Sequence, residues 1–384
     1  MLNPAIIIVA YNRVNSLKRL LKSIGEAKYP HFNIPLIISI DFARDNNEVI
    51  EAAHNFKWEY GTKEVISHEK NLGLRKHIIH CGAYSLKYGS VIVLEDDLYV
   101  SLNFYEYSKA ALKFSEDRPG ISGISLYNHQ FNVHSRSEFS PIIDEYDNYY
   151  LQMASSWGQA WTKRHWLNFF EWYQQHDLIV SNSSLPKNVT SWSEKSWLKY
   201  FIAYLVETDT YFLYPRSSYS TNFNDAGTHI GTGSTVYQVP LNFGSRDNFN
   251  FSTLKNSRSV YDVFYENKKL FSYLNIIESE LSVDLYGKKE ISKEKKFLLT
   301  DKILQYKILK SFDRSLKPHD ANVIANILGS EIFLYDCSIK QANPYRPNVY
   351  RKIMYNIKSI NRIEAGIVFV QRIKEAINSV IFRK

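Results

Sequence analysis

The chain has 384 residues, of which 45% are hydrophobic and 15% aromatic. This composition supplies enough apolar side chains for a sizeable core, in one large or two ordinary domains, and is typical of a globular protein. The two cysteines, Cys81 and Cys337, are too far apart in sequence to predict a disulfide framework or a zinc site. The apolar run at 5–10 is too short for a signal peptide or a membrane span, so we expect a cytoplasmic protein.

The formal net charge of +8 is unevenly distributed. Residues 281–384 contain 20 Lys and Arg against 10 Asp and Glu, which gives +10, whereas residues 1–280 contain 27 against 29, which gives −2. The basic side chains of the last quarter lie in predicted helices with an apolar stripe and not among stacking aromatic residues. We therefore expect no nucleic-acid partner.

The first 125 residues alternate short apolar runs with amphipathic stretches. Strands are predicted at 5–10, 36–40, 64–67, 91–94 and 121–125, and helices at 13–27, 45–57, 74–88 and 101–115. Such alternation favours right-handed βαβ units and a mostly parallel sheet. We predict an α/β fold in which residues 1–125 form a Rossmann-like, nucleotide-binding half.

The remaining residues divide into two regions. Residues 126–268 are irregular and rich in aromatic residues, with helices predicted near 163–176 and 192–207, and we expect them to form the acceptor-binding half of the same domain. Residues 269–384 are rich in lysine, and helices are predicted near 298–316 and 351–382. This last region is expected to be a basic helical extension.

Three consecutive carboxylates, Glu95, Asp96 and Asp97, follow the strand predicted at 91–94. Ligands of open α/β sheets bind at the carboxyl ends of strands, and Mg²⁺ or Mn²⁺ takes one or two carboxylates together with phosphate oxygens. The triplet therefore indicates a metal and diphosphate site. The alternative is that these acids stabilise the amino end of the next helix, near Ser101.

The first strand ends in Ala10-Tyr11-Asn12-Arg13 and lacks the G-x-G-x-x-G turn of dinucleotide-binding domains. A Walker A loop is also absent from the sequence. These absences disfavour an oxidoreductase and leave metal-mediated binding of a diphosphate as the better interpretation.

Two further groups fall near the same sheet edge. Asp41 ends the second strand, where it can accept a hydrogen bond from a base or a ribose, or form an ordinary Asx turn. Asn71 and Gly73 form a turn before a helix whose first turn carries Arg75 and Lys76. These residues are candidates for contacts with the nucleotide, and the alternative is a capped surface helix with solvated charges.

The ordered segments PAIIIVAYNR, PLIISID, NLGLRKHI, VIVLEDDLYVSLNFYEY and SSWGQAW resemble those of GT-A-fold glycosyltransferases. More narrowly, the chain resembles the Golgi β-1,2-N-acetylglucosaminyltransferases that initiate complex N-glycan branches, together with their bacterial relatives. The likeness runs along residues 4–125 and more loosely to 268, and it does not cover the last quarter.

The resemblance implies that Asp97 binds Mn²⁺ or Mg²⁺, which bridges the diphosphate of a nucleotide sugar, and that Glu95 and Asp96 contact ribose or sugar groups. It also implies that the motif at the end of the first strand and the second-strand aspartate surround the nucleotide through Ala10, Tyr11, Arg13 and Asp41. The implied reaction is an inverting single displacement, in which an enzyme carboxylate deprotonates the acceptor hydroxyl.

The base is harder to assign. The family places it in an acidic pair before a tryptophan, but here Lys195 and Ser196 occupy that place, so Glu194 fits only with a shift of one residue. Glu194 has the alternative role of a capping box with Ser191. Asp225 is the rival candidate for the base.

Two segments of the second half are candidates for the donor site. Trp157 and Gly158 are expected to line the sugar pocket, because glycine permits close approach and tryptophan stacks on sugar rings, although packing in the core is the alternative. His229 ends an Asn- and Gly-rich loop and is a candidate to close over the diphosphate or to approach the metal, with an exposed turn as the alternative.

The segment 351–384 repeats apolar residues at helical spacing among basic residues. Such a helix can lie on the inner face of an anionic plasma membrane, or pack on the catalytic domain or another subunit.

We therefore expect a metal-dependent inverting glycosyltransferase that uses a nucleotide-diphosphate sugar, with UDP favoured, and a glycan or lipid-linked acceptor. The expected pathway is synthesis of a cell-surface polysaccharide such as lipopolysaccharide or capsule. The alternative is a noncatalytic module that binds nucleotide sugars or glycans at the membrane, which the missing acidic pair near Lys195 leaves open.

Overall fold

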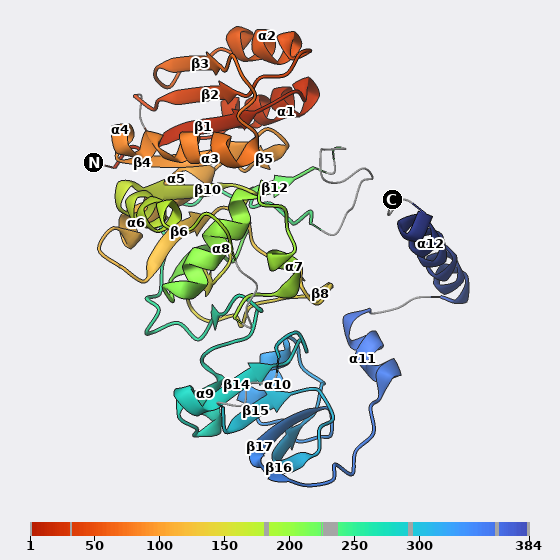
Figure 1. The fold of residues 1–384 in the computed structure, drawn as a ribbon. Coiled ribbons are helices and arrows are strands. Elements are labelled where there is room, and N and C mark those ends of the chain that lie inside the picture. The colour runs from red at the N-terminus through yellow and green to blue at the C-terminus, as the bar shows by residue number, and fades with distance from the viewer. Residues whose placement is uncertain are drawn as a thin grey trace.

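The computed structural model describes residues 2–30, 33–179, 184–223, 225, 237–290, 295–357 and 361–381. Figure 1 shows a large α/β body that holds the amino-terminal two thirds of the chain. A smaller sheet lies beside it, and two helices at the end of the chain run along one side.

The amino-terminal half forms the alternating pattern that its sequence predicts. Its elements are β1 (Ala5–Ala10), α1 (Val14–Gly25), β2 (Leu36–Ile40), α2 (Asn47–Asn55), β3 (Lys63–Ser67), α3 (Leu74–Gly82), α4 (Tyr84–Tyr88), β4 (Ser90–Glu95), β5 (Leu98–Val100), α5 (Phe104–Ser115) and β6 (Ile121–Ser125). All five predicted strands are present, and β1, β2 and β6 have the predicted bounds. The short strand β5 was not predicted, and it follows the acidic triplet directly.

The central sheet has nine strands in the order β13-β9-β11-β6-β10-β4-β1-β2-β3. β4, β1, β2 and β3 are parallel, and β10 runs antiparallel to both of its neighbours. β1 is in register with its neighbours, so that Ala10 lies beside Ile40 and Val9 beside Glu95. The residues that follow β1, β2 and β4 therefore meet at one edge of the sheet, as expected for a parallel α/β protein.

β1 is buried on both of its faces. Ile6 and Ile8 pack in a hydrophobic cluster with α1, α2 and α5, whereas Ile7 and Val9 pack in a second cluster with α3, α6 and α8. This arrangement explains the unbroken apolar run, because successive side chains of a strand point to opposite faces and helices cover both. The mixed α/β fold that the sequence predicts is confirmed.

The second half extends the same sheet. Its elements are β7 (Phe131–Asn132), β8 (Ser137–Glu138), β9 (Asn148–Leu151), β10 (Gln159–Thr162), α6 (Lys163–Gln174), α7 (Lys187–Thr190), α8 (Trp197–Glu207), β11 (Tyr211–Pro215), β12 (Ser220–Asn222) and β13 (Val260–Tyr261). β9, β10, β11 and β13 join the nine-stranded sheet, while β12 pairs with β5 in a separate two-stranded sheet. The pairing of β12 with β5 brings residues 220–222 next to the acidic triplet.

The last region begins with α9 (Leu270–Leu274) and a 3₁₀ turn, η1 (Glu278–Glu280), and continues as β14 (Leu281–Asp284), β15 (Phe297–Thr300), β16 (Tyr306–Phe312), α10 (His319–Ile324), β17 (Ile332–Lys340), α11 (Val349–Asn356) and α12 (Arg362–Ile381). The predicted carboxyl-terminal helix is present as α11 and α12. Among the described helices, none is long and apolar enough to cross a lipid bilayer.

The helix predicted near 298–316 is wrong, because this segment forms β15 and β16, which both pair with β17. Leu298 and Leu299 are consecutive, and they are buried in two different clusters on opposite faces of the small sheet. A strand covered on both faces gives an apolar run that also fits a helix, and the pairing partner lies too far along the sequence to be recognised locally.

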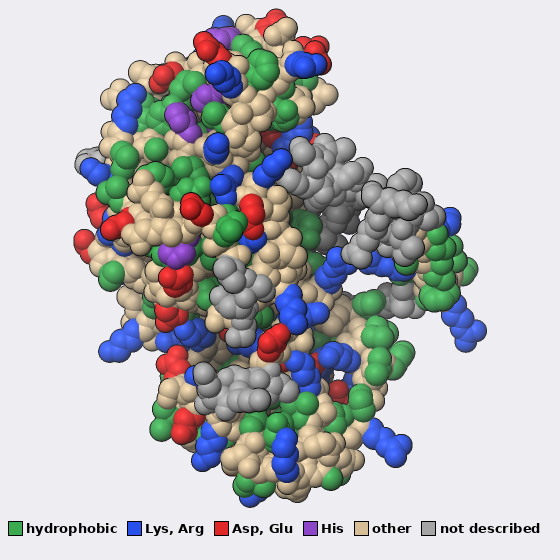
Figure 2. All heavy atoms as spheres, in the orientation of Figure 1, with side chains coloured by type: hydrophobic (Ala, Val, Ile, Leu, Met, Phe, Trp, Pro, Cys, Tyr) green, Lys and Arg blue, Asp and Glu red, His purple; other side chains and the backbone are tan. Residues whose placement is uncertain are grey.

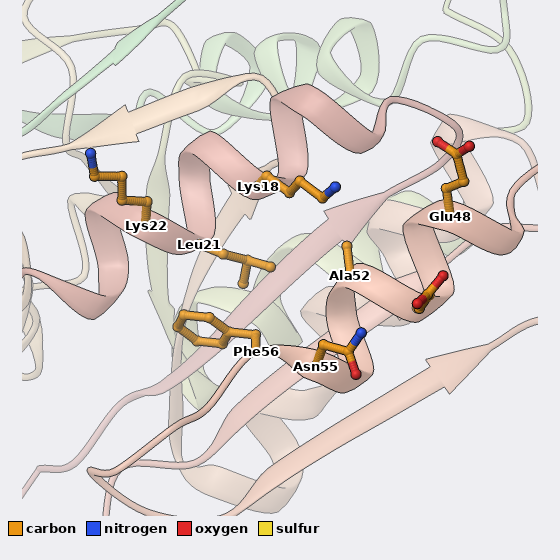
Figure 3. Close-up of a pocket in the computed structure, with 8 residues that line it drawn as sticks. Lys18, Leu21, Lys22, Glu48, Ala52, Asn55 and Phe56 are labelled. Atoms are coloured by element: carbon orange, nitrogen blue, oxygen red, sulfur yellow. The ribbon is translucent and has the colours of Figure 1, made fainter.

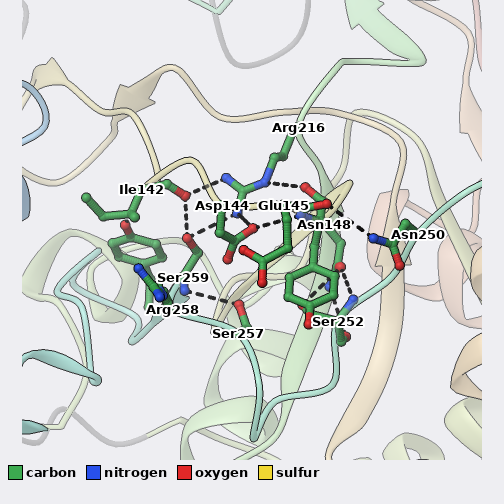
Figure 4. Close-up of polar contacts among 12 residues, drawn as sticks. Ile142, Asp144, Glu145, Asn148, Arg216, Asn250, Ser252, Ser257, Arg258 and Ser259 are labelled. Atoms are coloured by element: carbon green, nitrogen blue, oxygen red, sulfur yellow. Dashed lines mark hydrogen bonds and ion pairs between the residues drawn. The ribbon is translucent and has the colours of Figure 1, made fainter.

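Arg216 fixes the irregular loop of the second half, as Figure 4 shows. Its Nε donates to the carbonyl of Tyr146 at 2.8 Å, and its Nη1 donates to that of Ile142 at 2.6 Å. Its Nη2 lies 2.6 Å from Asp144 Oδ1 in an ion pair with little exposure, at 14% and 2% for the two side chains. Arg216 thus satisfies backbone groups that no strand or helix pairs.

We expect Arg216→Ala to destabilise the fold by about 3–5 kcal/mol, because it leaves the buried Asp144 carboxylate without its partner. The matched control is Arg246→Ala, which breaks the ion pair with Asp147 but removes an arginine that is 46% exposed. That variant should lose about 1 kcal/mol or less. Urea unfolding, monitored by circular dichroism, measures the free energy of unfolding of both variants. Equal losses would contradict the structural role of Arg216.

Candidate active site at the acidic turn

The acidic turn, residues Glu95, Asp96 and Asp97, connects β4 to β5. The backbone N–H of Asp96 donates to the carbonyl of Val9 at 3.0 Å, and the carbonyl of Asp97 accepts from the N–H of Phe223 at 3.0 Å. The turn is therefore attached to β1 on one side and to the end of β12 on the other. α5 begins at Phe104, so the three acids do not cap this helix.

Arg13 binds two of the three acids. It lies between β1 and α1, and its Nη1 donates to Asp97 Oδ2 at 3.1 Å while its Nη2 pairs with Asp96 Oδ1. Burial opposes the charge of Arg13, but attraction to Asp96 and Asp97 outweighs it and raises the pKa of the guanidinium. The Asp97 side chain is 23% exposed and that of Asp96 is 3% exposed, so Asp97 is the more accessible of the two.

One arginine does not balance three carboxylates. Burial, followed by repulsion from its two acidic neighbours, raises the pKa of Glu95. Burial is also the largest effect on Asp96, whose pKa is raised to about 6 despite the nearby arginine. Glu95 Oε1 and Asp96 Oδ2 are buried and have no hydrogen-bond partner. An excess of negative charge with unpartnered oxygens is the environment that a divalent cation would satisfy.

Within the described part of the chain, no group of three or more His, Cys, Asp or Glu side chains is arranged to hold a metal ion. The acidic turn therefore does not form a closed protein cage. This donor set fits Mg²⁺ or Mn²⁺, which are held by one or two carboxylates while ligand phosphates and water complete the coordination.

Asp41 holds the loop that precedes α3. Its Oδ1 accepts from the N–H of Leu72 at 2.8 Å, and its Oδ2 accepts from the N–H of Gly73 at 2.9 Å. Asn71 Nδ2 donates to the carbonyl of Phe42 at 2.9 Å, and Gly73 has a φ of 72°, which favours glycine. Asp41 thus makes more than a local Asx turn, because it joins the ends of β2 and β3.

Arg75 and Lys76, both in the first turn of α3, have different surroundings. Arg75 Nη1 donates to the carbonyl of Glu194 at 2.7 Å, and its guanidinium lies 4.7 Å from the centre of the Tyr200 ring. Lys76 is exposed. Arg75 therefore connects the loop at 71–73 to the segment that precedes α8.

Glu194 is held by side chains of α8. Lys199 Nζ pairs with its Oε1, and the Tyr200 hydroxyl donates to its Oε2 at 2.6 Å. These two hydrogen bonds lower the pKa of Glu194. α8 begins at Trp197 with Ser196 as its N-cap, so Ser191 and Glu194 do not form a capping box. Trp197 makes a hydrogen bond with Glu95, which links this segment to the acidic turn.

Asp225 lies on the opposite side, against α1. Ser16 Oγ donates to its Oδ2 at 2.7 Å, and Arg19 Nη1 donates to its Oδ1 at 3.4 Å. Burial raises the pKa of Asp225, but the hydrogen bonds from Arg19 and Ser16 outweigh burial and lower it. Both candidates for the base are therefore engaged in ion pairs.

Trp157 and Gly158 lie where β10 begins. Gly158 has a φ of 92°, and a Cβ added there would lie 2.7 Å from Ser220 Oγ, so only glycine fits. The Trp157 ring packs on Tyr127 and Tyr237, with ring centres 4.6 and 5.1 Å apart. Trp157 is thus partly buried and packs against the core, where Tyr127 is 1% exposed.

The other predicted residues lie at the end of β1 or outside the described residues. Ala10 is buried at the end of β1. Tyr11 is 36% exposed and donates its backbone N–H to Asp96. His229 lies outside the described residues.

Sequence reasoning missed several contacts of this site. Ser16 and Arg19 are three residues apart in the helix predicted at 13–27. This spacing could have indicated that their side chains are neighbours on the helix surface. The position of Trp197 was partly indicated by the family resemblance, because a tryptophan is expected after the acidic pair. Tyr127 and Tyr237 carry no sequence signal, because only the folded chain brings them to Trp157.

A groove of about 580 Å³ lies between α1 and α2 (Figure 3). Its base is formed by Leu21, Ala52 and Phe56, with charged side chains from both helices around it. Its lining residues include no predicted site residue. The groove is therefore separate from the acidic turn.

Solved structures give weak likenesses. They include the mannosyltransferase PcManGT from Pyrobaculum calidifontis in complex with GDP-Man and Mn²⁺ (11% identity, 44% of this chain, 47% of that chain, TM-score 0.31). S. aureus TarS 1-349 in complex with UDP-GlcNAc is similar at 12% identity (60% of this chain, 62% of that chain, TM-score 0.39). GalNAc-T7 with UDP, GalNAc and Mn²⁺ is similar at 12% identity (56% and 43%, TM-score 0.37). The chain spans less than two thirds of each of these structures.

A comparison with curated proteins finds no match to this chain. Residues 5–167 match the family model described as "Glycosyl transferase family 2". The matched region contains β1, β2, β4 and the acidic turn. The acidic turn thus lies in the part of the chain that is similar to glycosyl transferase family 2, and this match supports glycosyltransferase as the enzyme class.

Proposed function

We propose that the chain is a metal-dependent, inverting glycosyltransferase that takes a sugar from a nucleotide-diphosphate donor, with a UDP-sugar favoured. The observation that carries the proposal is the acidic turn. Glu95 and Asp96 each have a buried oxygen without a partner, and Arg13 pairs with Asp96 and Asp97 at the carboxyl edge of the sheet. This edge is where open α/β sheets bind ligands, and it lies within the region that matches the family model.

Asp97 is the proposed metal ligand, because its carboxylate is more accessible than that of Asp96. A bound Mn²⁺ or Mg²⁺ would neutralise charge on the departing nucleoside diphosphate. Arg13 supplies a second positive charge beside the same site. Glu95 and Asp96 are proposed to position ribose or sugar groups.

The nucleotide is proposed to lie along the ends of β1, β2 and β3. Tyr11 and Asp41 are the proposed contacts there, together with Ala10, Asn71, Gly73, Arg75 and Lys76. Support comes from Asp41 and Gly73, whose hydrogen bond keeps the loop at 71–73 on this edge. Trp157 and Gly158 are proposed to line the sugar pocket, because an aromatic face beside a glycine suits a sugar ring. His229 is retained as a proposed donor contact on the family resemblance alone.

Asp97→Ala should reduce kcat/KM for donor turnover by about 100-fold or more, because a metal ligand is lost, without unfolding the protein. EDTA should abolish turnover, and Mn²⁺ should restore it. Hydrolysis and transfer are measured with a panel of UDP-, GDP- and CDP-sugars.

Asp45→Ala is the matched control for that experiment, because Asp45 is an exposed acid of the same region. It should behave as the wild type. Full activity of Asp97→Ala, or activity that EDTA leaves undiminished, would contradict the assignment of Asp97 as a metal ligand. Donor binding without any turnover would instead favour a noncatalytic module.

Glu194 is the proposed general base, with Asp225 as its rival. The Glu194 side chain is 43% exposed, and its segment is linked to the acidic turn through Trp197. The hydroxyl of Tyr200 and the ammonium of Lys199 orient its carboxylate. A proton taken from the acceptor hydroxyl would reside on Glu194 while the acceptor oxygen bonds to the anomeric carbon and the bond to the diphosphate breaks.

Glu194→Gln should lower the transfer rate by about 100-fold or more while leaving the Kd for the donor unchanged, since a general base contributes to the chemical step and not to donor binding. The transfer rate of both variants, Glu194→Gln and Asp225→Asn, is measured in stopped assays. Calorimetry with donor and Mn²⁺ gives the Kd of each. If Asp225→Asn alone shows this pattern, the rival is the base.

We propose that the acceptor is a glycan or lipid-linked sugar of a cell-surface polysaccharide such as lipopolysaccharide or capsule, and that α12 binds the anionic face of a membrane. Figure 2 shows hydrophobic side chains along this helix. Ile363, Ile367 and Ile377 are 76%, 64% and 53% exposed. The +10 charge of residues 281–384 complements anionic lipids. We also propose the narrower resemblance to the Golgi β-1,2-N-acetylglucosaminyltransferases, which rests on the EDDL segment at 95–98.

The protein should pellet with phosphatidylglycerol vesicles and not with phosphatidylcholine vesicles, and salt should weaken the binding. Ile367→Asn should reduce this binding several-fold, since it interrupts the apolar stripe. Val368→Asn is the control, because Val368 is 49% exposed but lies about 100° further around the helix. Equal binding of all three proteins would show that the stripe is not the contact.

A further inference from the structure

Three polar side chains at the start of helix α1 lie near the acidic turn. Ser16 and Arg19 are three residues apart on α1, so their side chains are neighbours on the helix surface, and Arg13 directly precedes the helix. Arg13 binds the carboxylates of Asp96 and Asp97 directly. Ser16 and Arg19 do not reach the turn and bind Asp225 instead.

Asp225 is connected to the acidic turn through the end of β12. Leu98, the first residue of β5, pairs with Asn222, the last residue of β12. The next residue, Phe223, donates its backbone N–H to the carbonyl of Asp97 at 3.0 Å. The Phe223 ring lies 3.7 Å from the guanidinium carbon of Arg19. Arg19 therefore holds both the ring of Phe223 and the carboxylate of Asp225.

We propose that Asp225 and Arg19, with Ser16 and Phe223, form a clamp that positions Asp97. This inference rests on the proposed function, because it assigns the clamp to the placement of the donor-binding acid. Arg13 fixes the side chains of the turn, and the clamp fixes the backbone that follows Asp97. Asp225 is then a positioning residue and not the base.

Partial burial makes the clamp strong enough for this role. The side chains of Arg19 and Asp225 are 25% and 30% exposed, so water competes with their ion pair less than at an open surface. Asp225 also accepts from Ser16 at 2.7 Å, which fixes the carboxylate in one orientation. Phe223 adds a cation–π contact with the guanidinium.

Two variants test the clamp by separating donor affinity from chemistry. Arg19→Gln and Asp225→Ala should each raise the KM for the donor by about tenfold, while kcat at saturating donor and Mn²⁺ stays close to that of the wild type. The double variant should raise the KM by less than the two single effects combined, because both substitutions remove the same Arg19–Asp225 ion pair. Arg19→Lys keeps the charge and should recover part of the affinity.

Hydrogen exchange of the Phe223 amide gives a readout that does not depend on turnover. Both variants should accelerate this exchange, because the N–H bonded to the Asp97 carbonyl loses its support. Lys22→Gln is the matched control, since Lys22 is 72% exposed on the same helix and pairs only weakly with Glu26 at 3.8 Å. It should change neither the exchange nor the KM.

The clamp is overturned if Asp225→Ala lowers kcat with an unchanged donor KM while Arg19→Gln is normal, which is the pattern of a base. It is also overturned if Phe223 exchange is the same in all variants. Failure of the proposed function has a different signature, because the wild type would then turn over no donor while the exchange experiment still tests the clamp.

Discussion

The ion pairs of Arg13 with Asp96 and Asp97 are the interaction on which the candidate site depends. Three adjacent carboxylates at the end of a buried strand repel one another, and burial strengthens the penalty. Arg13 compensates part of this charge and leaves an excess that a cation can complete. The acidic turn alone carries an excess of negative charge. A ligand that brings a cation would neutralise this excess.

The sheet, and not the loops, sets the relative positions of Arg13 and the acids. Val9 is paired with Glu95 in the parallel ladder, so the strand that leads to Arg13 and the strand that leads to the acids are held in one register. Helices cover both faces of β1, and its residues alternate between two hydrophobic clusters. A shift of one residue would exchange these faces, so the core specifies the register that the charges require.

The fold of the first 125 residues was predictable because its signals are local. Apolar runs such as 5–10 are short, bounded and separated by amphipathic helices, and the position of Asp41 at a strand end follows from the same pattern. The helix assigned to 298–316 failed because consecutive buried residues such as Leu298 and Leu299 fit two periodicities. The contacts of Asp225 were not predictable, since Ser16 and Arg19 are 209 and 206 residues away in sequence.

The sequence separation of the paired charges has a consequence for how the site forms. Arg13 and Asp97 are 84 residues apart, and Ser16 and Asp225 are 209 apart. Contacts of this range close only after the intervening strands have paired, because loop closure costs entropy that later contacts must recover. A nascent or partly unfolded chain therefore carries the acids without their arginine. Assembly of the acidic turn and cooperative folding of the central sheet are the same event.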